Sequence, residues 1–488
     1  MGQAPRRGSF RFMPPSAFRR FTMGFVLSIL YFVTNYLTPP VLFGPLAVAR
    51  IELIIAALLF FVSLPKLLGS LILRTPQSLA LIGLVFAASL SVLVAMRWPG
   101  GAVHALLAFL PSAFAYFLVC LHCNSKRKLQ VLVLMLLFVC LFVIANGCIE
   151  LLHGGQESVH NLPTDAYTAN ANAWQMEHPY LLAKPNDQEG PNRLKGLGLI
   201  NDPNDFGQLL VCAIPLMFVF WRPKRMLLNF VSVILPVSAL LFGAYLTHSR
   251  GALVALVAVA VVAARRRIGT LPAGLVAGGL FAAAMALNFT GGRDISASAG
   301  EDRTALWGES LQALKSHPLF GVGLGGLGDY TDSHHTAHNS VAVCAAELGV
   351  FGLYFWSLFL FPTLRDALAI ASPAKVSEGQ PAKPEEELFP QAARKIETLD
   401  KAEINRLGRL LVLSLTGFLV AGWFLSRAFV MTFFLLGGLV EVVYEMALRR
   451  EMIAPRLRLA RVAPYAGILA FALVLVLYIM LRILNLMR

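Results

Sequence analysis

The chain contains 488 residues, of which 57% are hydrophobic and 14% charged, and its mean hydropathy of +0.68 excludes an ordinary soluble domain. The formal net charge is +14 at pH 7. Most of this surplus lies in short loops between apolar runs, so membrane topology explains it better than nucleic-acid binding does. The runs are continuous rather than alternating, which excludes an outer-membrane barrel.

Apolar runs of about 20 residues recur along the chain, each long enough to cross a hydrocarbon core of about 30 Å. They predict an all-α, polytopic helical membrane protein with about 12–13 transmembrane helices. The predicted spans are residues 22–38, 41–64, 78–96, 101–121, 129–152, 204–221, 226–247, 251–265, 270–289, 337–363, 407–425, 428–447 and 463–485.

These spans divide the chain into three sets of helices, two external loops and one cytoplasmic linker. The order is N-terminal transmembrane helices (1–152), an external loop (153–203), transmembrane helices (204–289), a large external loop (290–336), one transmembrane helix (337–363), a cytoplasmic linker (364–406) and C-terminal transmembrane helices (407–488). The linker is rich in Lys, Glu and Pro, a composition that favours disorder.

The orientation follows from the basic loops, because Lys and Arg accumulate on the cytoplasmic side of a membrane. With the N-terminus inside, every basic cluster falls on the inner side; the clusters are Lys66 with Arg74, Lys126–Lys128, Arg222–Arg225, Arg265–Arg267 and Arg449–Arg461. We therefore expect residues 153–203 and 290–336 to lie outside, together with the C-terminus.

The end of the first external loop carries two cations before a polar turn. Arg193 and Lys195 belong to the stretch RLKGLGLINDPNDFG, in which the Asn, Asp and Pro residues favour a turn and a cap for the next helix. Either cation could bind a phosphate, but loop cations are common, and turn plus cap explains the remaining polar residues.

Arg250 lies between two predicted spans, at their outer ends, in the sequence THSRGALVAL. Such an arginine can simply extend to the membrane interface. Alternatively, its guanidinium can bind a diphosphate group bidentately at the level of the lipid headgroups.

The large external loop begins with an amphipathic pattern. From Asp302 to Lys315 the apolar residues follow helical spacing, which predicts a short surface helix capped by Asp302, with Arg303 in its first turn. Arg303 could face the membrane opening, or it could pair with a neighbouring carboxylate. Pro318 ends the helix, and the glycines of residues 321–328 predict a tight backbone fold against the membrane helices rather than a dinucleotide site.

His338 is predicted to open the next span, on the same helical face as the small residues Ala345, Gly349 and Gly352. An imidazole that points into the protein there can act as a general base near neutral pH. Two alternatives remain: a histidine that only hydrogen-bonds a neighbouring helix, and a zinc ligand grouped with His334 and His335. Asn339 could orient the imidazole or bind a substrate hydroxyl.

These three clusters resemble the O-antigen ligase and Wzy-type polysaccharide polymerase superfamily of bacterial inner membranes. The resemblance rests on RLKGLGLINDPNDFG, on SRGA, and on RTALW…HPLFGVGLGG…HNSVAVCAAELGVFG. It implies a metal-independent and cofactor-independent glycosyltransferase that takes a glycan from undecaprenyl diphosphate and joins it to an acceptor hydroxyl. Arg193, Arg250, Arg303 and His338 match the arginines and histidine of the family pattern. Lys195 could compete with Arg193, and the 364–406 insert and thirteenth span are not expected of every member.

The residues and the resemblance together predict an inner-membrane enzyme with a periplasmic active site. His338 would accept the proton of the attacking hydroxyl, while Arg250, Arg303 and Arg193 would stabilise the departing diphosphate. The expected partners are the undecaprenyl-diphosphate-linked glycan, an acceptor glycan or lipid, membrane lipids and the polysaccharide assembly machinery, with no nucleic acid. Ligase and Wzy-type polymerase of capsule or exopolysaccharide differ in acceptor, which the sequence does not decide.

A different class, a transporter of bicarbonate or another small anion, would need charged residues inside the spans along a path through the membrane. The candidates are Arg50, Glu52, Glu347, Glu441 and Glu445. The sequence lacks an inverted repeat with interrupted helices, which disfavours transport.

Overall fold

Helices make up most of the protein in a computed structural model, which describes residues 22–39, 51–152, 181–183, 191–291, 298–332, 334–372 and 399–486. The first half contains α1 (Met23–Leu37), α4 (Ile51–Leu68), α5 (Pro76–Met96), α6 (Pro99–His122), α7 (Lys126–Leu152), α10 (Pro203–Met217), α11 (Met226–Asn229) and α12 (Leu235–Leu246). The second half contains α13 (Arg250–Ile268), α14 (Thr270–Ala286), α15 (Ser298–Ser316), α16 (Leu327–Tyr330), α17 (Ser340–Ala371), α18 (Lys401–Gly422), α19 (Met431–Leu448) and α20 (Leu459–Leu486).

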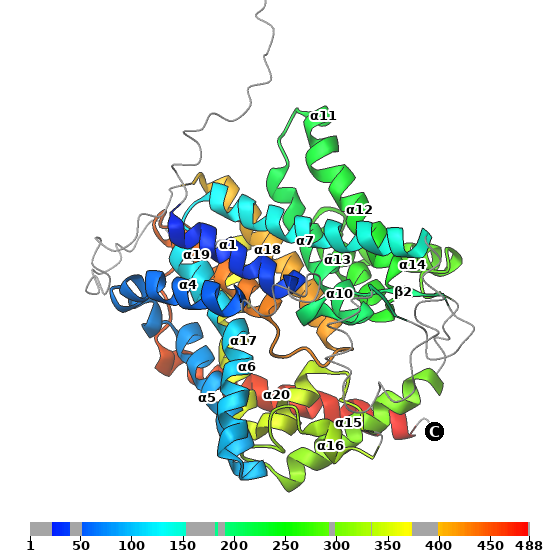
Figure 1. Ribbon diagram of the computed structural model, residues 1–488. Helices are drawn as coiled ribbons and strands as arrows, with labels where there is room; N and C mark the ends of the chain where they lie inside the picture. Colours follow the sequence, from blue (N-terminus) through cyan, green and yellow to red (C-terminus); the bar gives the residue numbers. More distant parts are fainter. Residues whose placement is uncertain are drawn as a thin grey trace, which may run out of the picture.

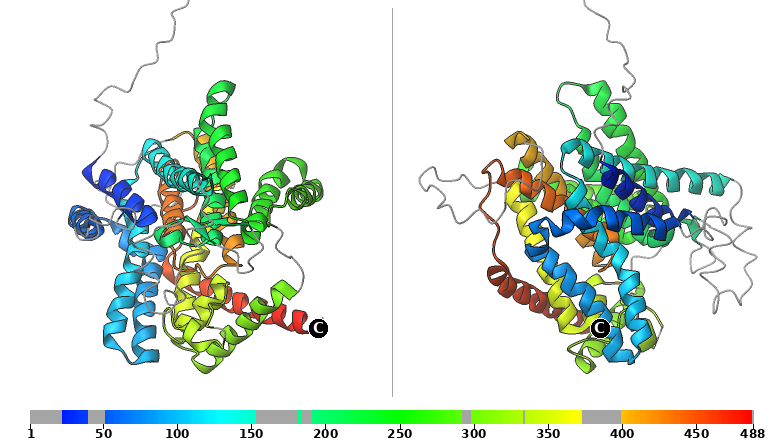
Figure 2. Two further views of the ribbon diagram at one scale, coloured as in Figure 1. Left: turned by 45° about the vertical axis from the view of Figure 1, so that its right-hand side comes forward. Right: turned by 60° about the vertical axis from the view of Figure 1, so that its left-hand side comes forward.

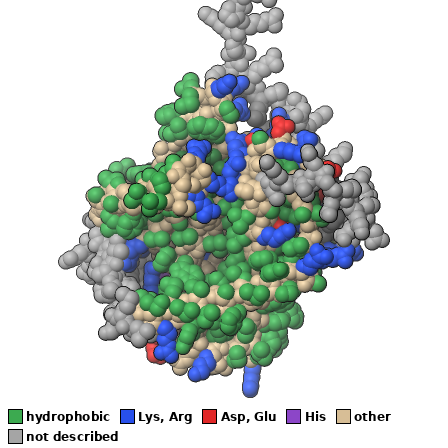
Figure 3. Space-filling model, turned by 180° about the vertical axis from the view of Figure 1, so that it is seen from behind, with side chains coloured by type: hydrophobic (Ala, Val, Ile, Leu, Met, Phe, Trp, Pro, Cys, Tyr) green, Lys and Arg blue, Asp and Glu red, His purple; other side chains and the backbone are tan. Residues whose placement is uncertain are grey.

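The helices confirm the all-α membrane fold. Ten helical segments of the described chain are long and apolar enough to span a membrane. They are α4, α5, α6, α7, residues 203–220 with α10, residues 226–246 with α11 and α12, α17, α18, α19 and α20. Two further apolar helices, α1 and α14, have 15 and 17 residues, and α13 ends in three arginines. A large part of the surface is hydrophobic, as expected of a protein surrounded by lipid (Figure 3).

The linker between α17 and α18 is shorter than its predicted range of 364–406. Residues 364–371 continue α17, and α18 already begins at Lys401, so helix occupies both ends of that range. Residues 373–398 lie outside the described part of the chain, as do residues 153–180 and 184–190 of the first external loop.

The core surrounds α19, whose apolar window is 89% buried, against 17% for α20 and 11% for α4. Phe433 of α19 stacks on Phe418 of α18, with ring centroids 5.1 Å apart, and Phe359 of α17 meets it edge-on. α5 and α6 form a hairpin beside α17 (Figures 1 and 2). The central helices therefore hold α17 firmly, and α20 packs against it from outside.

α17 is broken at Gly349, where φ is 65° and ψ is −167°. The break is filled by the glycine-rich segment that precedes α16. Val350 N–H donates to the Pro318 carbonyl over 2.8 Å, and Phe351 N–H donates to Leu319 over 3.2 Å. The segment also donates a hydrogen bond to α17: Val322 N–H donates to the Ala346 carbonyl over 2.9 Å. The tight fold expected of the glycines is confirmed, but Gly349 interrupts the helix rather than only serving close helix packing.

Three of the acidic residues considered for a transport path have structural partners, whereas Glu52, in the first turn of α4, has a buried Oε1 without a hydrogen-bond partner among the described residues. The Glu347 carboxylate accepts hydrogen bonds from the backbone of Gly325 and Leu327 at the break in α17. Glu441 pairs with Arg456 over 2.6 Å, and Glu445 lies 3.6 Å from the same guanidinium. Arg50 lies outside the described residues. These carboxylates therefore fix loops and helices to one another.

Candidate active site

Three helices begin with a side-chain cap supplied by the motifs of the sequence. The Asp202 carboxylate accepts from Asn204 N–H over 2.8 Å at the start of α10, and Ser249 Oγ accepts from Ala252 N–H over 3.2 Å at the start of α13. Asn339 Oδ1 accepts from two amides at the start of α17, over 2.9 and 3.0 Å. Because a helix N-terminus carries partial positive charge, each of these ends favours an anion.

The first two ends are joined through Arg193, which lies in the short strand β2 (Arg193–Leu194), paired with β1 (Leu182–Ala183). Arg193 Nε donates to the Thr247 carbonyl and Nη2 donates to Asn204 Oδ1, each over 3.0 Å. The same Asn204 oxygen accepts from Ser249 Oγ over 2.9 Å. Arg193 is 9% exposed, so its guanidinium holds the loop, α10 and α13 together.

The third end is tied to the others by Arg427, in the turn between α18 and α19. Its guanidinium forms an ion pair with Asp205, in the first turn of α10. Its backbone N–H donates to Ser340 Oγ, at the start of α17, over 3.1 Å. Sequence reasoning missed this pair. The available signal was an arginine between two apolar runs on the predicted outer side, as for Arg250.

Arg250 is the first residue of α13 and is half-buried. The next residue, Gly251, packs against Phe424, and an added Cβ would come within 3.3 Å of the Phe424 Cβ. The start of α13 therefore lies against the same turn that carries Arg427.

His338 does not open α17, contrary to the prediction from helical spacing. It precedes the cap residue Asn339 and adopts the left-handed backbone conformation, with φ of 47°. Its N–H donates to Ser426 Oγ over 2.9 Å, and that hydroxyl donates to Thr336 Oγ1 over 2.8 Å. The argument that placed His338 on the small-residue face of the helix was wrong, because the cap residue ends the helix before it.

The imidazole of His338 is half-buried among charged groups. Burial lowers its pKa below the usual 6.5, and the positive charge of Arg303 lowers it further. Asp202 acts in the opposite direction, while His335 and Arg427 add to the lowering. The imidazole is therefore mostly neutral at pH 7. Its charged neighbours include Arg303 of α15 and Arg427 of the α18–α19 turn.

Arg303 reaches this region from α15, although its position in the helix differs from the prediction. The helix already includes Ser298, so Asp302 is not its cap and Arg303 lies in the second turn. Four residues later, the buried Trp307 donates its indole N–H to the Ala337 carbonyl over 2.9 Å. Because Ala337 precedes His338, this bond sets the position of α15 relative to the imidazole.

Lys195 and Asn339 differ in their surroundings. Burial lowers the pKa of Lys195, and the nearby carboxylates of Glu150 and Asp202 partly offset this effect. Asn339 is fully buried, and besides capping α17 it donates to the Trp423 carbonyl over 3.0 Å. Its amide is therefore engaged in the protein, which suits positioning of the His338 backbone rather than contact with a substrate hydroxyl.

The histidine cluster does not form a metal site in the described part of the chain. No group of three His, Cys, Asp or Glu side chains in these residues lies close enough together to hold a metal ion. The chemistry that the described groups offer is a neutral imidazole able to accept a proton, next to guanidinium groups and helix N-termini able to stabilise negative charge.

Residues 235–357 match the family described as O-Antigen ligase. The matched segment runs from α12 into α17 and contains Arg250, Arg303, His338 and Asn339, whereas Arg193 and Arg427 lie outside it. No curated protein matches the chain.

Proposed function

We propose a specific reaction for this protein, supported by the match of residues 235–357 to the O-antigen ligase family, a family of ligase- or polymerase-type membrane enzymes. The enzyme transfers a glycan from undecaprenyl diphosphate to an acceptor hydroxyl at the periplasmic face of a bacterial inner membrane. It serves cell-surface polysaccharide assembly. The observation that carries the proposal is that the Ser426–Arg427 turn joins His338 to the starts of two helices: His338 N–H bonds Ser426, and Arg427 pairs with Asp205 of α10 and bonds Ser340 of α17. The positive charge of Arg303 acts on the same imidazole.

His338 acts as the general base in this proposal. With its pKa lowered below 6.5, the imidazole is neutral at pH 7 and able to accept the proton of the acceptor hydroxyl. The hydroxyl oxygen then forms a bond to the anomeric carbon, with inversion, as the bond from that carbon to the diphosphate oxygen breaks. The proton remains on His338 and the electron pair leaves with the diphosphate.

Arg303 and Arg250 stabilise the charge that develops on the leaving diphosphate. A preorganised donor of this kind typically contributes about 10²–10³ in rate. Arg193 has a different role in the proposal: both ends of its guanidinium already bond the protein, so it positions the starts of α10 and α13. Lys195, half-buried near Asp202, is the further candidate for a phosphate contact.

Release of undecaprenyl diphosphate by purified protein tests the reaction. The assay supplies lipid-linked glycan and either a lipid A–core acceptor or a second lipid-linked repeat unit. Wild-type protein should release undecaprenyl diphosphate with only one of the two acceptors, which separates ligase from polymerase. His338→Gln and Arg250→Gln should lose at least about 10²-fold in rate.

Arg97→Gln is the matched control, because Arg97 is an exposed arginine in the turn between α5 and α6. This variant should retain wild-type activity. Absence of release by folded wild-type protein with both acceptors contradicts the transfer reaction. Full activity in His338→Gln contradicts the assignment of the base.

A further inference from the structure

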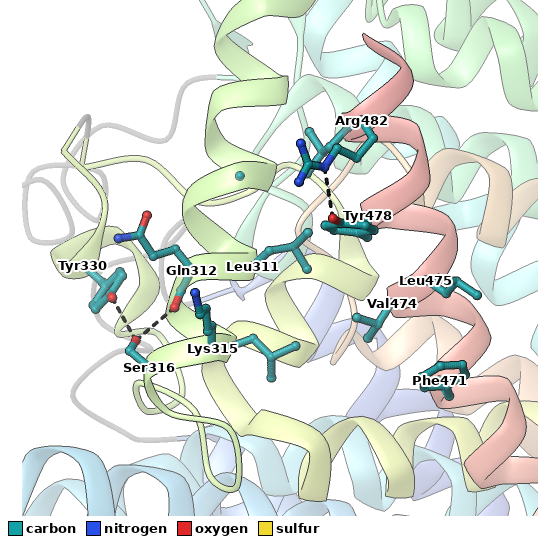
Figure 4. Close-up of a pocket in the computed structure, with 13 residues that line it drawn as sticks. Leu311, Gln312, Lys315, Ser316, Tyr330, Phe471, Val474, Leu475, Tyr478 and Arg482 are labelled. Carbon is teal, nitrogen blue, oxygen red and sulfur yellow. Dashed lines mark hydrogen bonds between the residues drawn. The ribbon is translucent and has the colours of Figure 1, made fainter. Parts of the chain in front are cut away.

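A crevice of about 980 Å³ lies between α15 and α20, away from the imidazole (Figure 4). One wall is the second half of α15, from Gly308 to Ser316, and the other is α20 from Phe471 to Arg482. Its volume is in the range of cavities that hold a complete organic ligand.

The lining is suited to a hydrocarbon chain with an anionic head. Aliphatic and aromatic side chains form most of it, including Leu311, Val474 and Leu475. The two charged side chains among the described lining residues, Lys315 and Arg482, are both cations. Because α20 is apolar and only 17% of its window is buried, the crevice borders the surface that faces lipid.

The two cations of the crevice lie at different levels along its length (Figure 4). Arg482 donates to Tyr478 Oη over 3.0 Å and lies at the end beside Leu311, while Phe471 lies at the opposite end (Figure 4). Moving from Lys315 to Leu311 along α15 leads toward Arg303. The eight residues from Leu311 to Arg303 correspond to about 12 Å of helix, so the end with Arg482 is the one nearer the imidazole.

A small apolar cluster connects the crevice with the candidate site. Leu481, which lines the crevice, belongs to a buried group with Leu477, Trp307 and Ala337. Ala337 accepts the Trp307 indole hydrogen bond and directly precedes His338. The wall of the crevice and the backbone of the proposed base thus share one packed unit.

We propose that this crevice binds the isoprenoid chain of the lipid-linked donor, with the chain along α20 toward Phe471 and the diphosphate end near Arg482. This inference rests on the proposed function. Arg482 guides the diphosphate toward Arg303. The apolar walls contact the isoprenoid chain, which occupies the crevice in place of a membrane lipid. The diphosphate lies at the end with Arg482 rather than beside Lys315, because the end with Arg482 is the one nearer the proposed base.

Crosslinking tests binding independently of transfer. The probe is a photoactivatable polyprenyl diphosphate without a sugar, added to wild-type protein in nanodiscs of phosphatidylglycerol and phosphatidylcholine. Crosslinked peptides should come from residues 308–316 and 471–482. Val474→Trp, which fills the crevice, should reduce the crosslinking at least fivefold. Ile479→Trp is the matched control, since Ile479 is 45% exposed on α20 and does not line the crevice; it should leave the yield unchanged.

A second comparison tests the charged end. Arg482→Gln should weaken binding of the diphosphate probe about tenfold and leave binding of the corresponding uncharged polyprenol unchanged. Crosslinks at other helices, or an equal yield in Val474→Trp, would overturn the proposal. Loss of the crosslink on raising phosphatidylglycerol, with the donor KM for transfer unchanged, would assign the crevice to a phospholipid and overturn it too.

The two proposals fail in different ways. A crevice that binds the probe in a protein without transferase activity supports the lipid site and removes the reaction. Transfer at wild-type KM by Val474→Trp supports the reaction and removes this lipid site.

Discussion

Replacing Gly349 by alanine is expected to destabilise the protein by roughly 2–6 kcal/mol. The backbone at Gly349 has a φ of 65° and a ψ of −167°, a conformation almost confined to glycine, in which a side chain costs about 1–3 kcal/mol. The new Cβ would also clash with the backbone of Leu319 and lie 2.6 Å from Phe320 N. Moving that segment away breaks the bonds from Val350 and Phe351, worth about 0.5–1.5 kcal/mol each.

Thermal unfolding in detergent measures this effect, together with the rate of proteolysis in residues 318–336. Gly467→Ala in α20 is the matched control, because nothing lies within 4 Å of its added Cβ. A helical glycine replaced by alanine should gain about 0.5–1 kcal/mol. If Gly349→Ala unfolds at the wild-type temperature and resists protease equally, the broken helix does not depend on the loop as argued.

Three further outcomes follow from the candidate site. The positive charge of Arg303 lowers the pKa of His338, so Arg303→Gln should move the acidic limb of the pH–rate profile to higher pH. The carboxylate of Asp202 raises that pKa, so Asp202→Asn should move the limb to lower pH. An acidic limb at the wild-type pH in both variants would contradict the coupling. Trp307→Phe keeps an aromatic ring in the buried cluster but loses the bond to the Ala337 carbonyl and part of the packing. It should cost at least about 1–3 kcal/mol in stability, measured by unfolding, and reduce kcat. Arg193→Lys keeps the charge but not both hydrogen bonds, so it should lower the melting temperature, and unchanged stability would refute its bridging role.

The sequence was sufficient for the fold class and for the motifs of the candidate site. Long apolar runs report membrane helices directly, since lipid requires the backbone of a span to bond within itself. The motifs around Arg250 and His338 each lie at the start of a helix, and Ser249 and Asn339 cap these two helices.

Features that depend on contacts distant in the chain were not predictable in this way. The break at Gly349 lies inside a continuous apolar run, and its hydrogen-bond partners come from Pro318 and Leu319. Asp205 looked like part of a turn and a cap because its partner, Arg427, is more than two hundred residues away in sequence. The left-handed backbone of His338 is likewise imposed by the cap and by Ser426.

The interrupted helix α17 has a consequence for how the protein is made. Its half from Ser340 to Leu348 and its half from Val350 onward cannot both satisfy their amides until residues 318–323 are in place. Unsatisfied amides are costly in lipid, so the membrane-embedded form matures only when residues 318–323 have folded against α17. Substitutions in that segment should therefore be recognised first by membrane quality control, as reduced amounts of protein, before any catalytic defect is visible.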